Sequence, residues 1–161
     1  MAALRVLAIA VASGRAGYVL MQGRQLLDWG ITVKAVKTGT ELVGFVQELI
    51  NRTRPDVVVT EATTAPCRKG TRTKELIASI AAIASHNEVL DVAVERPRLF
   101  PSKYEEAEAL AERYPDVRGY LPAQKRRIFD FEPRGMVIFE AIALAEAAVR
   151  GSPEQLAQAL G

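Results

Sequence analysis

The chain has 161 residues, of which 49% are hydrophobic and 25% are charged, and its formal net charge is +2. These values are ordinary for one soluble globular domain with a sizeable core, and no apolar run approaches the roughly 20 residues of a membrane-spanning helix. The single cysteine, Cys67, excludes an internal disulfide and suits a reducing cytoplasm, where we expect the protein to reside. Because His86 is the only histidine, a Cys/His metal site is excluded, and Ser-His-Asp or Cys-His catalysis is not favoured.

The N-terminal part of the chain predicts three short strands joined by tight turns. Residues 5–11 form a nearly continuous apolar run with a β-branched bias, which is typical of a strand buried on both faces. Two further strands are predicted at 17–21 and 25–36, after turns that contain glycine. The first residues also resemble a secretory signal, but the charged region before the apolar run is weak, so we favour a folded strand. This strand ends in Ala10-Val11-Ala12-Ser13 without an acidic residue.

After these strands, helices and strands alternate with short connections. Apolar residues spaced three and four apart indicate helices, and short β-branched runs indicate strands. In chain order, the predicted elements are a helix over 40–51, a strand over 57–59, a helix over 73–86, a strand over 89–94, and helices over 103–114 and 136–149. A strand that follows a helical crossover lies parallel to an earlier strand. We therefore expect an α/β fold whose five-stranded mixed sheet combines an antiparallel three-strand meander with two parallel strands, flanked by helices.

Local signals predict where several helices begin. Thr38 or Thr40 is a suitable N-cap for the first helix, and Ser102 opens a capping box. Pro133 occupies the place of the first residue of the last long helix. The chain shows no linker or repeat. We therefore expect a single domain over residues 1–150 and a short, loosely held tail helix within 151–161.

Two carboxylates are candidates for chemistry. Glu61 closes the buried strand at 57–59, and ligands of open α/β sheets bind at the carboxyl ends of strands, although a glutamate there can also simply face water. Glu140 lies in an apolar helix and needs a partner, which is either a metal ion or an arginine such as Arg134 or Arg127. The ion pair is favoured because it is the usual resolution. If Glu61 and Glu140 converge, they form half of an oxygen-ligand site of the kind that Mg²⁺ or Mn²⁺ uses.

Basic residues gather in two places along the sequence. The first cluster is Arg68, Lys69, Arg72 and Lys74, and the second is Lys125, Arg126 and Arg127. A pI near 8.8 is by itself no argument for nucleic acid. A solvated face and a phosphate-binding surface therefore both remain open for these clusters.

Several short motifs are similar to those of the RuvC (Holliday-junction resolvase) branch of the RNase H-like fold. Family members begin with a strand of the form I-D-P-G followed by G-Y, which the stretch IAVASGRAGY at 9–18 resembles. Their fourth strand ends in a glutamate, as VVVTE does at Glu61, and a lysine opens a late helix, as Lys103 does. Their last helix carries D-A-x-A-x-A, which EAIALA from Glu140 resembles. The resemblance spans most of the chain.

This resemblance implies a carboxylate cluster that holds two divalent ions, Mg²⁺ or Mn²⁺, for phosphodiester hydrolysis. Glu61 and Glu140 match ligand positions, and Glu132 or Asp130 could supply a further acid. Ala10, however, stands at the position of the first-strand aspartate, and Val137 stands where an additional acid is often found. A methyl group cannot coordinate a metal, so the resemblance also implies weak or absent nuclease activity.

We therefore expect a RuvC-like nucleic-acid-binding protein with a degenerate nuclease site. Its partner would be branched or duplex DNA, and by analogy with the family it would form a homodimer away from membranes. The expected phosphate contacts are Arg68, Lys69, Arg72, Lys74, Lys103, Lys125, Arg126 and Arg127. Two alternatives remain open. One is an active metal-dependent endonuclease that uses Glu61, Glu140 and Glu132, and the other is a non-catalytic homodimer in which the last helix and Trp29 face a partner.

Overall fold

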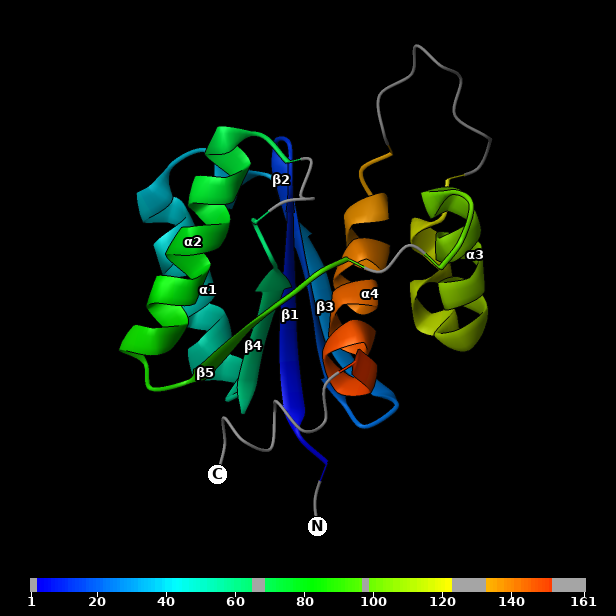
Figure 1. Ribbon diagram of the computed structural model, residues 1–161, viewed down its shortest axis with the longest axis horizontal. Helices are drawn as coiled ribbons and strands as arrows, with labels where there is room; N and C mark the ends of the chain where they lie inside the picture. The colour runs from blue at the N-terminus through cyan, green and yellow to red at the C-terminus, as the bar shows by residue number, and fades with distance from the viewer. Residues whose placement is uncertain (1–2, 65–68, 97–98, 123–132, 152–161) are drawn as a thin grey trace.

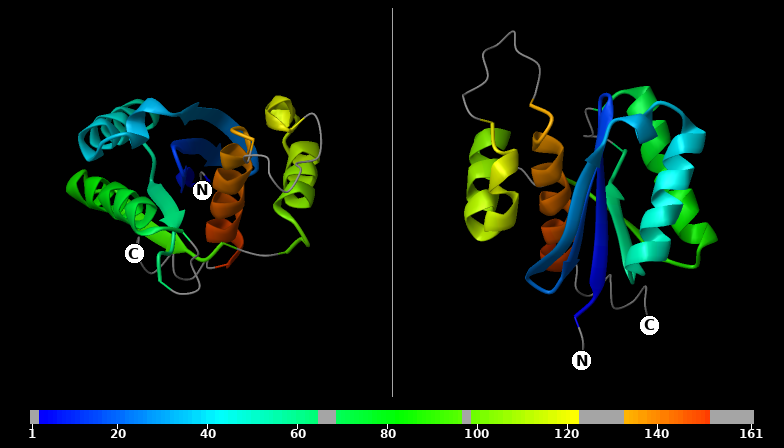
Figure 2. Two further views of the ribbon diagram at one scale, coloured as in Figure 1. Left: turned by 90° about the horizontal axis from the view of Figure 1, so that it is seen from above. Right: turned by 180° about the vertical axis from the view of Figure 1, so that it is seen from behind.

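The computed structural model describes residues 3–64, 69–96, 99–122 and 133–151. Its centre is a five-stranded mixed sheet with the strand order β3-β2-β1-β4-β5, as the sequence predicts. Two helices, α1 and α2, cover one face of the sheet, and α4 covers the other, with α3 outside α4 (Figures 1 and 2). In the described part of the chain, no helix combines the length and the apolar character that crossing a membrane requires.

The predicted meander consists of β1 (Arg5–Ala12), β2 (Arg15–Gln22) and β3 (Gln25–Thr32). Successive strands pair antiparallel, and glycines with φ of 77° and 61° make the two turns. The third strand is shorter than the predicted 25–36. The Thr32 hydroxyl accepts a hydrogen bond from the Ala35 amide and turns the chain into η1 (Lys34–Val36), a single 3₁₀ turn.

The crossover part of the fold begins with α1 (Gly39–Thr53), whose N-cap is Thr38, one of the two predicted residues. β4 (Val57–Glu61) follows and lies parallel to β1, and β5 (Leu90–Val94) lies parallel to β4. Between them runs α2 (Thr71–His86). The two strands that extend the meander are therefore parallel, as predicted.

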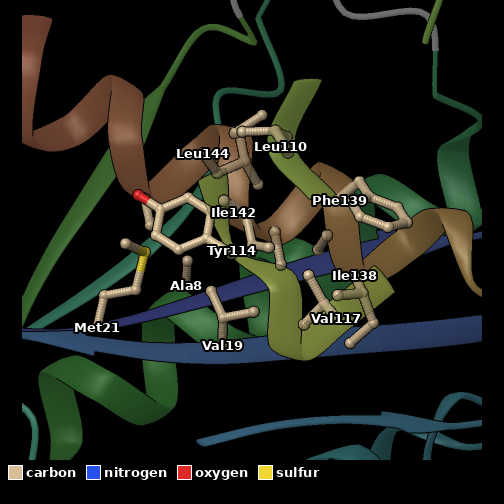
Figure 3. Packing of buried hydrophobic residues seen from close by; sticks show 14 of the residues in the cluster. Ala8, Val19, Met21, Leu110, Tyr114, Val117, Ile138, Phe139, Ile142 and Leu144 are labelled. Atoms are coloured by element: carbon tan, nitrogen blue, oxygen red, sulfur yellow. The ribbon is translucent and has the colours of Figure 1, made fainter. Parts of the chain in front are cut away.

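Side chains of β1 alternate between two cores, one on each face of the sheet. Leu7, Ile9 and Val11 point into the core beneath α1 and α2. Val6, Ala8 and Ala10 point into the core beneath α4, which Figure 3 shows in part. Trp29 of the edge strand β3 is half-buried and packs against this second core. Both faces of β1 are therefore covered, which explains its continuous apolar sequence.

The last part of the described chain covers the α4 side of the sheet. α3 (Lys103–Arg113) begins at Ser102, whose hydroxyl accepts the Glu105 amide as the capping box predicts. The 3₁₀ helix η2 (Pro115–Tyr120) follows, and α4 is Met136–Gly151. Because α4 lies between the sheet and α3, it is buried on nearly every side, which accounts for its apolar sequence.

Pro133 is not the first residue of α4, so that prediction is wrong. Its carbonyl oxygen accepts the Met136 amide, and the helix begins only after this turn. A Cβ on Gly135 would lie 2.3 Å from the Tyr120 carbonyl oxygen, so the chain passes η2 in close contact before α4 begins. The second basic cluster and the predicted tail helix at 153–160 lie outside the described residues.

Candidate functional site

The candidate site lies where β1, β4 and α4 meet. β1 and β4 run parallel with Ala8 opposite Val59, so their carboxyl ends lie next to each other. α4 packs on the face of the sheet opposite α1 and α2. It begins at the end of the molecule where β1 and β4 end, the upper end in Figure 1. The carboxyl ends of parallel strands are the usual place for a ligand in an open α/β sheet.

Two buried carboxylates converge in this place. Glu61 is the last residue of β4, in step with Val57 and Val59, which point into the core beneath α4. Glu140 lies in the second turn of α4, and each of the two residues is 8% exposed. Both carboxylates face one cation, the ammonium group of Lys69. Its Nζ lies 2.6 Å from Glu140 Oε1 and 3.8 Å from Glu61 Oε1.

Lys69 reaches this position from the loop that leads into α2. Besides its two ion pairs, its Nζ donates a hydrogen bond to the carbonyl oxygen of Val11, near the end of β1. The lysine side chain is 17% exposed. Oxygen atoms from β1, β4 and α4 therefore surround a single ammonium group, which has three N–H donors to offer them.

The predicted ion pair of Glu140 is present, but its described partner is not the arginine that we named. Glu140 pairs with Lys69 rather than with Arg134, and Arg127 lies outside the described residues. No periodic pattern marks Lys69, because it lies in a polar loop far from Glu140 in sequence. The one signal in the sequence for Lys69 as a partner is that it is a basic residue in the loop that follows Glu61.

The other two positions of the expected acidic cluster, 10 and 137, carry buried apolar side chains. Ala10 is 1% exposed and Val137 is 2% exposed. Gly17 pairs with Ala10 across the hairpin, and a Cβ on this glycine would lie 2.8 Å from Val137 Cγ1 and 3.1 Å from the Val137 carbonyl oxygen. The backbone of α4 therefore rests almost directly on the strand pair at this point.

A further buried carboxylate, that of Glu106 on α3, forms an ion pair with Arg96 close enough to Glu140 to feel its charge. Glu106 Oε1 accepts a hydrogen bond from Arg96 Nη2 at 3.1 Å. Burial raises the pKa of Glu106, the Arg96 guanidinium opposes this shift, and the negative charge of Glu140 adds to it. The sequence does not single out Glu106, because it is one of several glutamates in α3 and no local signal distinguishes it. The described carboxylates around the site thus have cations of the protein as partners.

The described residues do not fit the divalent ions that the family resemblance implies. Mg²⁺ and Mn²⁺ prefer several oxygen ligands, and carboxylates supply the charge. Here two carboxylates share a lysine, and the position of the first-strand acid is the methyl group of Ala10. Within the described ranges, no group of three or more His, Cys, Asp or Glu side chains is arranged to hold a metal. Asp130 and Glu132 lie outside those ranges.

The predicted basic residues have different surroundings. Arg72 donates hydrogen bonds to the carbonyl oxygens of Val36 and Lys37 at 3.2 and 2.7 Å, which ties the start of α2 to η1. Lys74 is half-buried on the first turn of α2, and Lys103 is the first residue of α3. Outside the described residues lie Arg68, Lys125, Arg126 and Arg127.

Solved structures that are similar to this chain in fold include RuvC and a viral resolvase. The Thermus thermophilus RuvC structure aligns with a TM-score of 0.53 and 18% identity, over 92% of this chain and 98% of that one. T. thermophilus RuvC in complex with a Holliday junction substrate gives 0.56 and 16%, over 92% and 97%.

A viral protein shows the same likeness. The Fowlpox virus resolvase, solved with substrate Holliday junction DNA, gives a TM-score of 0.58 at 10% identity, over 91% of this chain and 100% of that one. No family model matches the sequence, and no curated protein does either. The likeness at these identities shows the fold, which is RuvC-like.

Proposed function

We propose that this protein binds nucleic acid, with branched or duplex DNA as its ligand, and does not cut it efficiently. The observation that carries the proposal is the placement of Lys69 between Glu61 and Glu140. The fold supports the ligand, because two of the similar structures are complexes with Holliday junction DNA. The chemistry of the site supports the lack of cutting.

Phosphodiester hydrolysis needs an activated water and stabilisation of the leaving oxygen, which two divalent ions supply in nucleases of the resembled family. The Lys69 ammonium carries a single charge and already donates to Glu140 and Val11. It lies within a protein oxygen shell rather than beside an open ligand position. The ammonium therefore offsets one of the two carboxylate charges, and the described residues of the site supply no second cation to activate water.

Phosphate contacts would come from the two basic clusters of the sequence and from Lys103. We retain Arg68, Arg72, Lys74 and Lys103 and the cluster of Lys125, Arg126 and Arg127 as the proposed contacts. We leave out Lys69, because its ammonium is engaged inside the site. Each phosphate contact releases counterions from DNA, so binding should weaken as salt rises.

The test is a charge reversal, Arg68→Glu with Lys74→Glu, measured by fluorescence anisotropy on labelled junction and duplex DNA over a series of salt concentrations. A matched reversal, Arg24→Glu with Arg54→Glu, changes the same charge at exposed positions near the amino-terminal end of β1. We expect the first pair to weaken binding and to lower the salt slope by about 2, and the second to change little. Circular dichroism checks that both variants are folded. Unchanged affinity and slope in the first pair would remove the proposed function.

A further inference from the structure

We propose that Lys69 is a tethered cation that permanently replaces divalent metal at Glu61 and Glu140. On this proposal the folded protein has no divalent-ion site between these carboxylates, and it does not need Mg²⁺ to approach nucleic acid. The first statement concerns only the residues of the site. The second rests on the proposed function, and the experiments below separate the two.

The ligands of the ammonium are those that a hard metal ion would otherwise use. They are carboxylate oxygens of Glu61 and Glu140 and the backbone carbonyl oxygen of Val11, from three different elements. Oxygen atoms of these kinds coordinate Mg²⁺ and Mn²⁺. A metal ion that entered between them would have to displace the ammonium or stand beside a positive charge in a poorly solvated place, and both are unfavourable.

The lysine is held in place by the fold. It is followed directly by Gly70, the N-cap of the long helix α2, and Arg72 ties that helix to the carbonyl oxygens that follow β3. Its side chain is 17% exposed, and those of Glu61 and Glu140 are each 10% exposed. The ammonium therefore does not belong to a surface lysine that exchanges freely with ions from solution.

Ala10 and Lys69 both lower the negative charge of this site relative to a three-carboxylate cluster. An aspartate at position 10 would add a third carboxylate on the α4 side of the sheet, whereas the methyl group of Ala10 adds no charge. With Lys69 in place, Glu61, Glu140 and the ammonium keep one net negative charge instead of two. This smaller charge reduces the repulsion of a phosphate backbone when no divalent ion is present.

Electron paramagnetic resonance of Mn²⁺ tests the proposal on the full chain without DNA, because bound Mn²⁺ lowers the signal of the free ion. We expect the parent to bind no Mn²⁺ at this site with a Kd below about 1 mM. The Mn²⁺ binding of Glu61→Gln should therefore equal that of the parent. Lys69→Met should bind Mn²⁺ at least about tenfold more tightly, and Lys69→Met with Glu61→Gln should lose that gain. Lys34→Met removes the charge of an exposed lysine and should gain nothing.

Two results would overturn the proposal. One is tight Mn²⁺ binding by the parent that Glu61→Gln abolishes, and this measurement needs no lysine variant. The other is a folded Lys69→Met protein whose Mn²⁺ affinity equals that of the parent. If Lys69→Met folds poorly in EDTA, a melting temperature that rises with Mn²⁺ or Mg²⁺ supports the proposal, because a ligand of the native state stabilises it. If it stays unfolded at every ion concentration, the parent measurement alone decides.

The consequence for nucleic acid is measured separately, by anisotropy in EDTA and in Mg²⁺. The parent should bind junction DNA equally well in both, within about threefold, and a strict need for Mg²⁺ would contradict the consequence. Absence of DNA binding under all conditions would refute the proposed function and leave the Mn²⁺ result to judge the tethered cation.

Discussion

Removal of the Lys69 ammonium should destabilise the protein far more than removal of a surface charge. In Lys69→Met, the Glu140 and Glu61 carboxylates stay at 10% side-chain exposure but lose this cation. Removing one partner of a buried ion pair typically costs 3–5 kcal/mol, and because some water reaches this site we expect about 3 kcal/mol. For a chain of this length, that loss lowers the melting temperature by roughly 6–12 °C.

Urea denaturation, followed by circular dichroism and by Trp29 fluorescence, measures this free energy of unfolding. A double-mutant cycle with Glu140→Gln isolates the pair, and the double variant should lose about 2 kcal/mol less than the two single losses together. The exposed control Lys34→Met should stay within about 0.5 kcal/mol of the parent. A loss below about 1 kcal/mol for Lys69→Met, or additive losses, would place the pair among ordinary surface ion pairs and refute the reasoning.

Two further predictions concern packing and proton binding away from the lysine. Gly17→Val should cost about 1–3 kcal/mol of stability, because its Cβ would lie 2.8 Å from Val137 Cγ1, whereas Gly44→Ala, with no atom within 4 Å, should gain about 0.5–1 kcal/mol in the same urea assay. Burial, followed by the hydrogen bond to Glu146, raises the pKa of Tyr114 to about 12. The folded state therefore keeps a proton that the unfolded state loses near pH 10, so stability should fall as the pH rises from about 10 to 12. Ultraviolet titration should show a lower Tyr114 pKa in Glu146→Gln, and an unchanged pKa would contradict the assignment.

The fold could be predicted from the sequence because its signals are local. The apolar run of β1, the glycines of the two hairpin turns and the alternation of helices and strands each indicate one element, and their order defines the sheet. The errors lie where the chain makes a hydrogen-bonded turn next to a strand or a helix. Thr32 ends β3 early by accepting the Ala35 amide, and Pro133 precedes α4 by a turn instead of opening it.

Of the candidate site, the sequence could predict the two carboxylates but not the lysine between them. Glu61 follows a buried strand and Glu140 interrupts an apolar helix, so each stands out in its own segment. Lys69 does not, because its role depends on a contact between a loop and a helix that are far apart in the sequence. A loop lysine is ordinarily a solvated residue or a phosphate contact, and only the packing of α4 against β1 and β4 shows that its ammonium lies among carboxylates.

The central claim, binding without efficient cutting, is tested most directly by a gel assay on labelled four-way junction, duplex and single-stranded DNA. Each DNA is incubated with the parent and with Glu61→Ala, in EDTA, in Mg²⁺ and in Mn²⁺. We predict that the parent retards junction or duplex DNA in all three conditions and leaves it intact, with no difference in cleavage between parent and variant. Metal-dependent cuts by the parent that Glu61→Ala abolishes would contradict this account and show an active nuclease.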